Sequence, residues 1–243
     1  MAQYDKLADL YAAMSERLRP YRTHVERHNF WKITGTVEGL TALDMACGDG
    51  VYSRALAERG AKVIGIDQSA EMIRIAKGIE DEQNLGIRYQ VQDAAELESI
   101  GQFDLVTAIY LLQYAPTREA LESMCRALRA NLKEGGRLVT LVFNPHMDPA
   151  RADMAKYGMT VKLPENKRDG APIWVEVLLD PPAGFTVYHW SQEAYEQALE
   201  DAGFTNLTWH EYEVSPEGLA ERPPGYWDDY ITNPHVVYVT CDT

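Results

Sequence analysis

The sequence predicts an α/β protein in which helices cover both faces of a mainly parallel sheet. Apolar strand-like runs alternate with helical segments between residues 40 and 143, which is the pattern of a parallel sheet. The first run leads into a glycine turn at 47–50, and a short helix follows, so strand, turn and helix stand in the order of a nucleotide cradle. A helix after residue 190 and two closing strands complete the pattern.

The composition is that of an acidic globular protein. The 243 residues are 46% hydrophobic and 25% charged, with a formal net charge of −14. This length accommodates one domain, 1–243, with an inserted cap. The negative charge argues against nucleic acid or an anionic membrane as partner, because phosphate groups are bound by Lys/Arg faces. An odd cysteine count, no signal peptide and no apolar segment of membrane-spanning length favour the cytoplasm. The sequence does not indicate an oligomeric state.

Polar side chains follow the predicted strands. Asp67 ends the second strand, 62–67, where a carboxylate can accept hydrogen bonds from both ribose hydroxyls. Asp93 follows the third strand, 87–92. Because the carboxyl ends of parallel strands meet at one edge, one ligand site is expected there. The strand ends at this edge are Cys47, Asp67, Asp93, Tyr110 and Asn144. The helices expected between the strands span residues 51–60, 69–78 and 117–132, and the last is expected to end at the Lys-Glu-Gly-Gly of 133–136.

Residues 144–190 interrupt this alternation. The segment is rich in Pro, Gly and Asp and contains three strand-like runs, 159–163, 173–179 and 185–190. An insertion of this length with strands of its own is more typical of a functional substrate cap than of a passive loop.

Residues 1–36 are predicted to be helical and to form a lid over the site. Tyr4 and Tyr11 lie on one apolar stripe, so their rings either pack in the core or bring a hydroxyl to the pocket. His24 and His28 are four residues apart on the next helix. Since no third ligand accompanies them, no metal site is predicted.

Four pieces of sequence appear in a specific order: A-L-D-M-A-C-G-D-G at 42–50, G-I-D-Q-S at 65–69, Q-D-A-A-E at 92–96 and L-K-E-G-G-R-L at 132–138. In this order and spacing they resemble the class I S-adenosylmethionine-dependent methyltransferases that act on small molecules. The N-terminal Y-D-x-x-A-x-x-Y and the late Y-W-D-D-Y at 226–230 also resemble the toxoflavin-pathway N-methyltransferase group.

The resemblance implies a Rossmann-like seven-stranded methyltransferase sheet with a C-terminal antiparallel hairpin and a β-rich cap inserted after strand 5. It implies S-adenosyl-L-methionine as cofactor, S-adenosyl-L-homocysteine as product and no metal. Asp67 would hold the ribose, Asp93 would accept from the adenine amino group, and Asp44 would support the turn. The cofactor-binding residues that the resemblance implies are Tyr11, Asp44, Cys47, Gly48, Gly50, Asp67, Gln68, Met72, Asp93, Ala94, Ile109 and Tyr110.

Aromatic residues in the cap and after the fourth strand predict a flat methyl acceptor such as a heterocycle or a phenol, although each ring could equally belong to the core. The resemblance implies that this acceptor belongs to secondary metabolism. The substrate-site candidates are Tyr114, Asn144, Trp174, Tyr226 and Trp227. His146 and His189 are candidate general bases because imidazole titrates near neutral pH, and Tyr110 is the third catalytic candidate. A phenol would benefit from a base, whereas a ring nitrogen with a free lone pair would not. The sequence leaves both open.

Two other functions stay open. A NAD-dependent oxidoreductase also has the strand, the glycine turn and the acidic strand end, but its G-x-G-x-x-G pattern fails here at Ser53. A non-catalytic nucleotide-binding module could share the fold, although the large cap would then lack a role. DNA and protein-glutamine substrates are disfavoured, because the chain after the fourth strand reads I-Y-L-L-Q-Y rather than N-P-P-Y.

Overall fold

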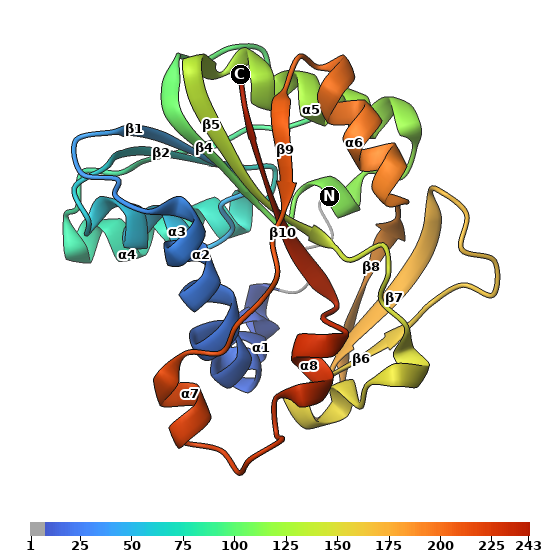
Figure 1. The fold of residues 1–243 in the computed structure, drawn as a ribbon. Coiled ribbons are helices and arrows are strands. Elements are labelled where there is room, and N and C mark those ends of the chain that lie inside the picture. Colours follow the sequence, from blue (N-terminus) through green and yellow to red (C-terminus); the bar gives the residue numbers. More distant parts are fainter. Residues whose placement is uncertain (1–7) are drawn as a thin grey trace.

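The computed structural model describes residues 8–243, so Tyr4 of the predicted lid lies outside the described residues. The described chain forms a central seven-stranded sheet and a separate three-stranded sheet (Figure 1). The order of the large sheet is β3-β2-β1-β4-β5-β10-β9. This order, with antiparallel closing strands and a second sheet inserted after β5, confirms the predicted fold class.

The parallel half of the large sheet contains five strands whose carboxyl ends all lie at one edge. Neighbouring strands run parallel from β3 to β5, with β1 in the centre between β2 and β4. Interior residues such as Leu43 and Val106 are fully buried because both faces of these strands are covered. The strands are β1 (Thr41–Met45), β2 (Lys62–Asp67), β3 (Arg88–Val91), β4 (Phe103–Ile109) and β5 (Leu132–Phe143).

Helices cover both faces of this sheet. Side chains of α3 and α4 share one hydrophobic core with Val63 and Leu105, and those of α5 and α6 share a second core with Leu43 and Val106 on the opposite face. These helices are α3 (Val51–Ala57), α4 (Ala70–Gln83), α5 (Arg118–Ala130) and α6 (Gln192–Asp201). Within residues 8–243, no helix combines the length and the apolar character needed to cross a membrane.

Two helix ends differ from the sequence-based prediction. α4 continues through Gly78, whose φ is not in the left-handed region, and ends at Gln83, where the following Asn84 has a left-handed φ of 51°. α5 ends at Ala130, so the Lys-Glu-Gly-Gly of 133–136 belongs to β5 and not to the helix end. The predicted ends of α4 and α5 were therefore wrong, because the glycines used to place them do not end these helices.

The C-terminal part of the chain closes the sheet. β10 (Val236–Asp242) pairs antiparallel with β5 on one side and with β9 (Thr205–Trp209) on the other. The connection between the two strands contains two short helices, α7 (Pro216–Ala220) and α8 (Asp228–Thr232). The predicted hairpin strands are confirmed, and the helices in their connection are additional.

The three-stranded sheet is the predicted cap. Its antiparallel strands β6 (Met159–Lys162), β7 (Ala171–Val177) and β8 (Ala183–His189) follow two 3₁₀ turns, η4 (Pro149–Arg151) and η5 (Met154–Tyr157). In Figure 1 the cap lies on the side of the molecule away from α3 and α4. One apolar face of the cap packs in a third hydrophobic core with the N-terminal helix and α8.

The N-terminal segment is continuous helix with one unusual turn. α1 (Ala8–Tyr21) passes into a π-helical turn, η2 (Arg22–Glu26), and then into α2 (Arg27–Thr34). Met14 and Leu18 of α1 are buried against the cap. The segment therefore touches the cap at one end and the main sheet at the other.

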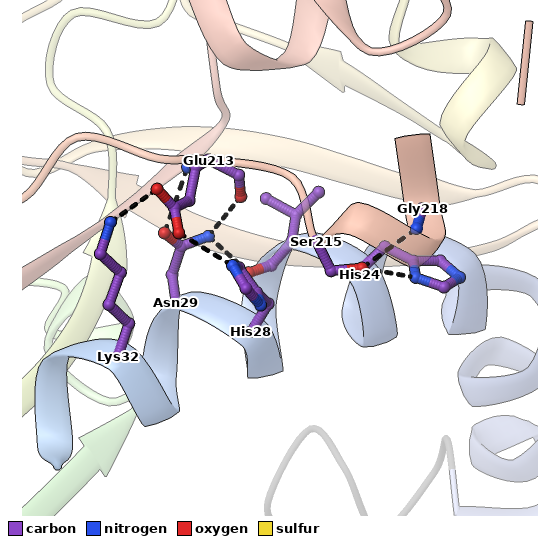
Figure 2. Close-up of polar contacts among 8 residues, drawn as sticks. His24, His28, Asn29, Lys32, Glu213, Ser215 and Gly218 are labelled. Atoms are coloured by element: carbon purple, nitrogen blue, oxygen red, sulfur yellow. Dashed lines mark hydrogen bonds and ion pairs between the residues drawn. The ribbon is translucent and has the colours of Figure 1, made fainter. Parts of the chain in front are cut away.

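Polar contacts fix η2 and α2 to the connection that follows β9 (Figure 2). His24 Nδ1 lies 3.0 Å from the Ser215 hydroxyl, and His28 Nε2 lies 3.0 Å from a carboxylate oxygen of Glu213. Lys32 pairs with the other oxygen of Glu213 over 2.6 Å. His24 and His28 therefore both face this connection, and their polar contacts anchor the helical segment to it.

Candidate functional site

A large cavity of about 670 Å³ opens at the carboxyl edge of the parallel strands. Its walls come from α1, the glycine turn, the ends of β2 and β4 and the residues that follow β3. This volume lies within the range of about 300–1,000 Å³ that is usual for small-molecule sites. The predicted cofactor residues that line it are Tyr11, Asp44, Cys47, Gly48, Asp67, Gln68, Met72, Asp93, Ala94, Ile109 and Tyr110.

Asp67 joins the end of β2 to the glycine turn. One carboxylate oxygen accepts the backbone N–H of Gly48 over 2.9 Å, and the other accepts the N–H of Ser69 over 2.8 Å. These two hydrogen bonds fix the orientation of the carboxylate, and Asp67 lines the large cavity. The turn itself needs left-handed backbone, with φ 61° at Ala46 and 57° at Gly48.

Gly50 serves packing and is not part of the cavity lining. Its φ is +83°, and a Cβ at this position would lie 2.3 Å from the hydroxyl oxygen of Tyr89. The absence of a side chain therefore lets the start of α3 sit directly against β3. The predicted contact of Gly50 with a ligand remains a prediction.

Asp44 supports the turn from below. Its side chain is 1% exposed and accepts hydrogen bonds from the hydroxyls of Ser53, over 2.6 Å, and Thr107, over 2.8 Å. Burial raises the pKa of Asp44 to about 6, against the opposing effect of these two hydrogen bonds. The arrangement connects β1, α3 and β4 beneath the cavity.

A small cavity of about 50 Å³ lies between the cap, α1 and the end of β5. The cap contributes the apolar side chains of Met159, Val175, Val177, Phe185 and Val187 to it. Arg22, Tyr110 and Tyr114 line both cavities, so the two spaces share a wall.

Two buried polar atoms of the small cavity's lining residues have no hydrogen-bond partner within the described chain: Arg22 Nε and Gln113 Oε1. Gln113, on the 3₁₀ turn η3 (Leu112–Tyr114), is 2% exposed. A buried polar atom without a partner is costly, so these two atoms lower the stability of this region in the absence of a partner.

A cluster of tyrosine hydroxyls surrounds one carboxylate in the shared wall. Glu26, on the π-helical turn, is 3% exposed and accepts from Tyr21 and Tyr52, each over 2.5 Å. Tyr110 also donates to Glu26, and its hydroxyl contacts that of Tyr21. Burial, followed by the charge of Glu26, raises the pKa of all three tyrosines well above the usual value. They are therefore neutral hydrogen-bond donors at physiological pH.

Tyr114 is the predicted substrate residue that the structure places at both cavities. The other four lie outside the lining of these two cavities. Asn144 donates to the carbonyl of Pro234 over 2.8 Å, Tyr226 donates to the carbonyl of Lys156 over 3.0 Å, and Trp227 donates to that of Gly218 over 2.9 Å. Trp174 is 40% exposed on β7. Their predicted contact with substrate stays a prediction.

The two candidate histidine bases also lie outside the lining of both cavities. His146 Nε2 lies 2.9 Å from the side-chain oxygen of Gln192, near the surface. His189 is buried on β8, and this burial lowers its pKa. The third candidate, Tyr110, lines both cavities.

The sequence-based prediction missed Glu26, Tyr21, Arg22, Gln113 and His235. Tyr21 and Glu26 are five residues apart, which is the spacing of a π-helix and not that of the α-helical stripe used in the prediction. His235, which lines the small cavity, is 6% exposed, and burial lowers its pKa to about 3. Within residues 8–243, no three His, Cys, Asp or Glu side chains converge as metal ligands.

Part of the lining of the large cavity lies in a region that resembles a known domain. A family model described as a methyltransferase domain matches residues 42–136. A curated relative from Coxiella burnetii, named "Ubiquinone biosynthesis O-methyltransferase", is 39% identical over 110 residues, which is 45% of this chain and 46% of the relative. The chain thus spans about half the length of the curated relatives that it matches.

Solved structures resemble almost the whole chain. An S-adenosylmethionine-dependent methyltransferase from Clostridium acetobutylicum aligns with a TM-score of 0.67 at 15% identity, covering 97% of this chain and 98% of that one. A putative enzyme of the same description from Listeria monocytogenes aligns with a TM-score of 0.65 at 22% identity, covering 90% and 96%. At these identities the likeness shows a common fold.

Proposed function

We propose that the chain is a class I S-adenosylmethionine-dependent methyltransferase that transfers a methyl group from this cofactor to a small planar acceptor. The match of residues 42–136 to a methyltransferase domain supports this proposal. The observation that carries this proposal is the large cavity at the carboxyl edge of the sheet. Its volume and its acidic strand ends fit a nucleoside with an amino-acid tail. When bound, the cofactor supplies a methyl group already activated on a sulfonium.

The residues of the cavity have separate tasks in this proposal. Asp67 accepts the ribose hydroxyls, and Asp93 accepts from the adenine amino group. The turn at Cys47 and Gly48 faces the amino-acid tail, and Asp44 holds that turn in place through Ser53. The protein then contributes mainly position, which is worth up to several kcal/mol of the barrier.

The acceptor would lie next to the shared wall, in reach of the cap. The apolar side chains that β6, β7 and β8 contribute to the small cavity lie on the far side of this wall, so the side of the acceptor that faces the cap would meet an apolar surface. The name of the curated relatives, O-methyltransferase, favours an oxygen over a nitrogen as the methylated atom. Residues 8–36 and 144–190 are then the lid and the cap of the acceptor site.

The test is transfer of labelled methyl from S-adenosylmethionine to a panel of phenols and nitrogen heterocycles, with Asp67→Asn as the matched control. The proposal is supported if the wild type forms labelled organic product and Asp67→Asn forms less of it. Cofactor binding without transfer to any acceptor would favour a non-catalytic binding module instead.

A further inference from the structure

Glu26 has a buried carboxylate that makes no ion pair within residues 8–243. Among residues 8–243, its partners are the hydroxyls of Tyr21, Tyr52 and Tyr110, and the ion pairs of this part of the chain do not include it. Burying a carboxylate without a cation in contact is costly. Hydrogen bonds from three separate elements offset that cost and fix the side chain in one position.

The Glu26 carboxylate is the acceptor in all of these hydrogen bonds. Tyr110 and Tyr21 line the small cavity, and each donates its hydroxyl hydrogen to Glu26, while the two hydroxyl oxygens also contact each other. A hydroxyl oxygen also has lone pairs, so Tyr110 can accept a hydrogen from a ligand while donating its own to Glu26. A ligand hydroxyl at the shared wall would complete a chain of two hydrogen bonds that ends on the carboxylate.

The local backbone is unusual at both ends of this chain. Glu26 closes the π-helical turn, a conformation found frequently at functional sites. Tyr110 has φ 64°, a left-handed conformation that is uncommon for an aromatic residue. Both residues line the large cavity, and Tyr110 also lines the small one.

We propose that Tyr110 accepts the proton of the acceptor's hydroxyl group and passes its own proton to Glu26 during methyl transfer. The electron pair left on the acceptor oxygen forms the new bond to the methyl carbon, and the pair of the broken carbon–sulfur bond stays on sulfur. Tyr21, in contact with both groups, provides a parallel route. This inference rests on the proposed function and narrows its acceptor to an aromatic hydroxyl.

Other charged and titratable groups also surround Glu26. Arg22 of the same turn is the neighbouring cation. Tyr212, Tyr230 of α8 and Tyr238 of β10 also feel its charge, and the hydroxyl of Tyr238 donates to the backbone carbonyl of Glu26 over 3.1 Å. Burial raises the pKa of these three tyrosines well above the usual value, so they keep their protons and Glu26 is the group that accepts the transferred proton.

The experiment compares pH–rate profiles of the wild type, Glu26→Gln and Tyr110→Phe with catechol and 4-nitrocatechol as acceptors. With catechol at neutral pH, Glu26→Gln should lower kcat about 100-fold, the lower end of the usual gain from general base catalysis. Tyr110→Phe should lower kcat less than Glu26→Gln does, because Tyr21 offers a second route for the proton to Glu26. Both losses should shrink at high pH, or with 4-nitrocatechol, whose nitro group makes its hydroxyl far more acidic.

Tyr195→Phe is the matched control, because it removes a buried tyrosine hydroxyl that has no hydrogen-bond partner within the described chain and lies outside both cavities. Its pH profile should match the wild type. If Glu26→Gln does not fold, Tyr110→Phe and the double variant with Tyr21→Phe give the same readout with the carboxylate retained.

Three outcomes would overturn the inference. One is a loss of kcat in the variants that is the same with catechol and with 4-nitrocatechol at every pH, since a structural role alone predicts that result. The others are methylation of nitrogen heterocycles but not of catechols, and no turnover of any catechol by a wild type that binds S-adenosylhomocysteine. Failure to bind S-adenosylhomocysteine at all would instead refute the proposed function itself.

Discussion

A carboxylate oxygen of Asp67 accepts the backbone N–H of Gly48 over 2.9 Å, which couples the end of β2 to the turn after β1. The acid that is proposed to hold the ribose thus also sets the position of the turn that faces the rest of the cofactor. Two parts of the site are therefore organised by one side chain before any ligand arrives.

Replacing Asp67 should weaken cofactor binding through both roles. Asp67→Ala removes the ribose acceptor and the tie to Gly48, at a cost of about 1.5–3 kcal/mol, or tenfold or more in Kd. Asp67→Asn keeps one acceptor oxygen and should lose less. Calorimetric titration with S-adenosylhomocysteine measures both, and wild-type affinity in a folded Asp67→Ala protein would refute this placement of the cofactor.

Gly50→Ala should destabilise the protein because its Cβ would overlap Tyr89, 2.3 Å from the hydroxyl oxygen, at a φ of +83°. Overpacking together with backbone strain is expected to cost about 2 kcal/mol or more. Gly78→Ala is the matched control, because that exposed helical position has no neighbour within 4 Å and should gain about 0.5–1 kcal/mol. Urea unfolding distinguishes them, and equal stability of the two variants would contradict the packing role.

Asp44 should make stability depend on pH in an unusual direction. Its folded pKa of about 6 exceeds the unfolded value of about 3.9, so the folded state binds more protons between these values and loses stability as pH rises. Relative to Asp44→Asn, the wild type should lose up to about 3 kcal/mol of unfolding free energy between about pH 4 and about pH 7. A difference that stays constant with pH, or that grows in favour of the wild type, would be inconsistent with a buried, desolvated carboxyl.

His235 should show the opposite dependence. Its pKa of about 3 in the folded protein lies below the unfolded value of about 6.5, so its stabilising contribution is present above about pH 6.5 and is lost as pH falls toward 3. NMR should find its ring neutral throughout the range from about pH 5 to about pH 8. Titration of this ring near pH 6.5 would show that water reaches the small cavity freely.

The parallel strands and the position of the large cavity were predictable because their sequence signals are local. Apolar runs that end in Asp67 and Asp93 report parallel strands and the edge where their ends meet. The inserted cap was visible as a break in the alternation. The match of the large cavity to almost all the predicted cofactor residues follows from the same local signals.

The acceptor side was not predictable because it depends on long-range packing. Aromatic composition does not tell which way a ring faces, and Trp227 stacks on Tyr157 inside the cap core, with ring centres 5.5 Å apart. The tyrosines around Glu26 come from α1, α3 and the end of β4, and a π-helical turn brings the carboxylate to them. No sequence window contains that cluster.

The central claim is tested most directly by calorimetric titration of the protein with S-adenosylhomocysteine, with NADH titrated in parallel. Micromolar binding of S-adenosylhomocysteine and none of NADH is the predicted result. Binding of NADH without S-adenosylhomocysteine would contradict the account and assign the glycine turn to an oxidoreductase.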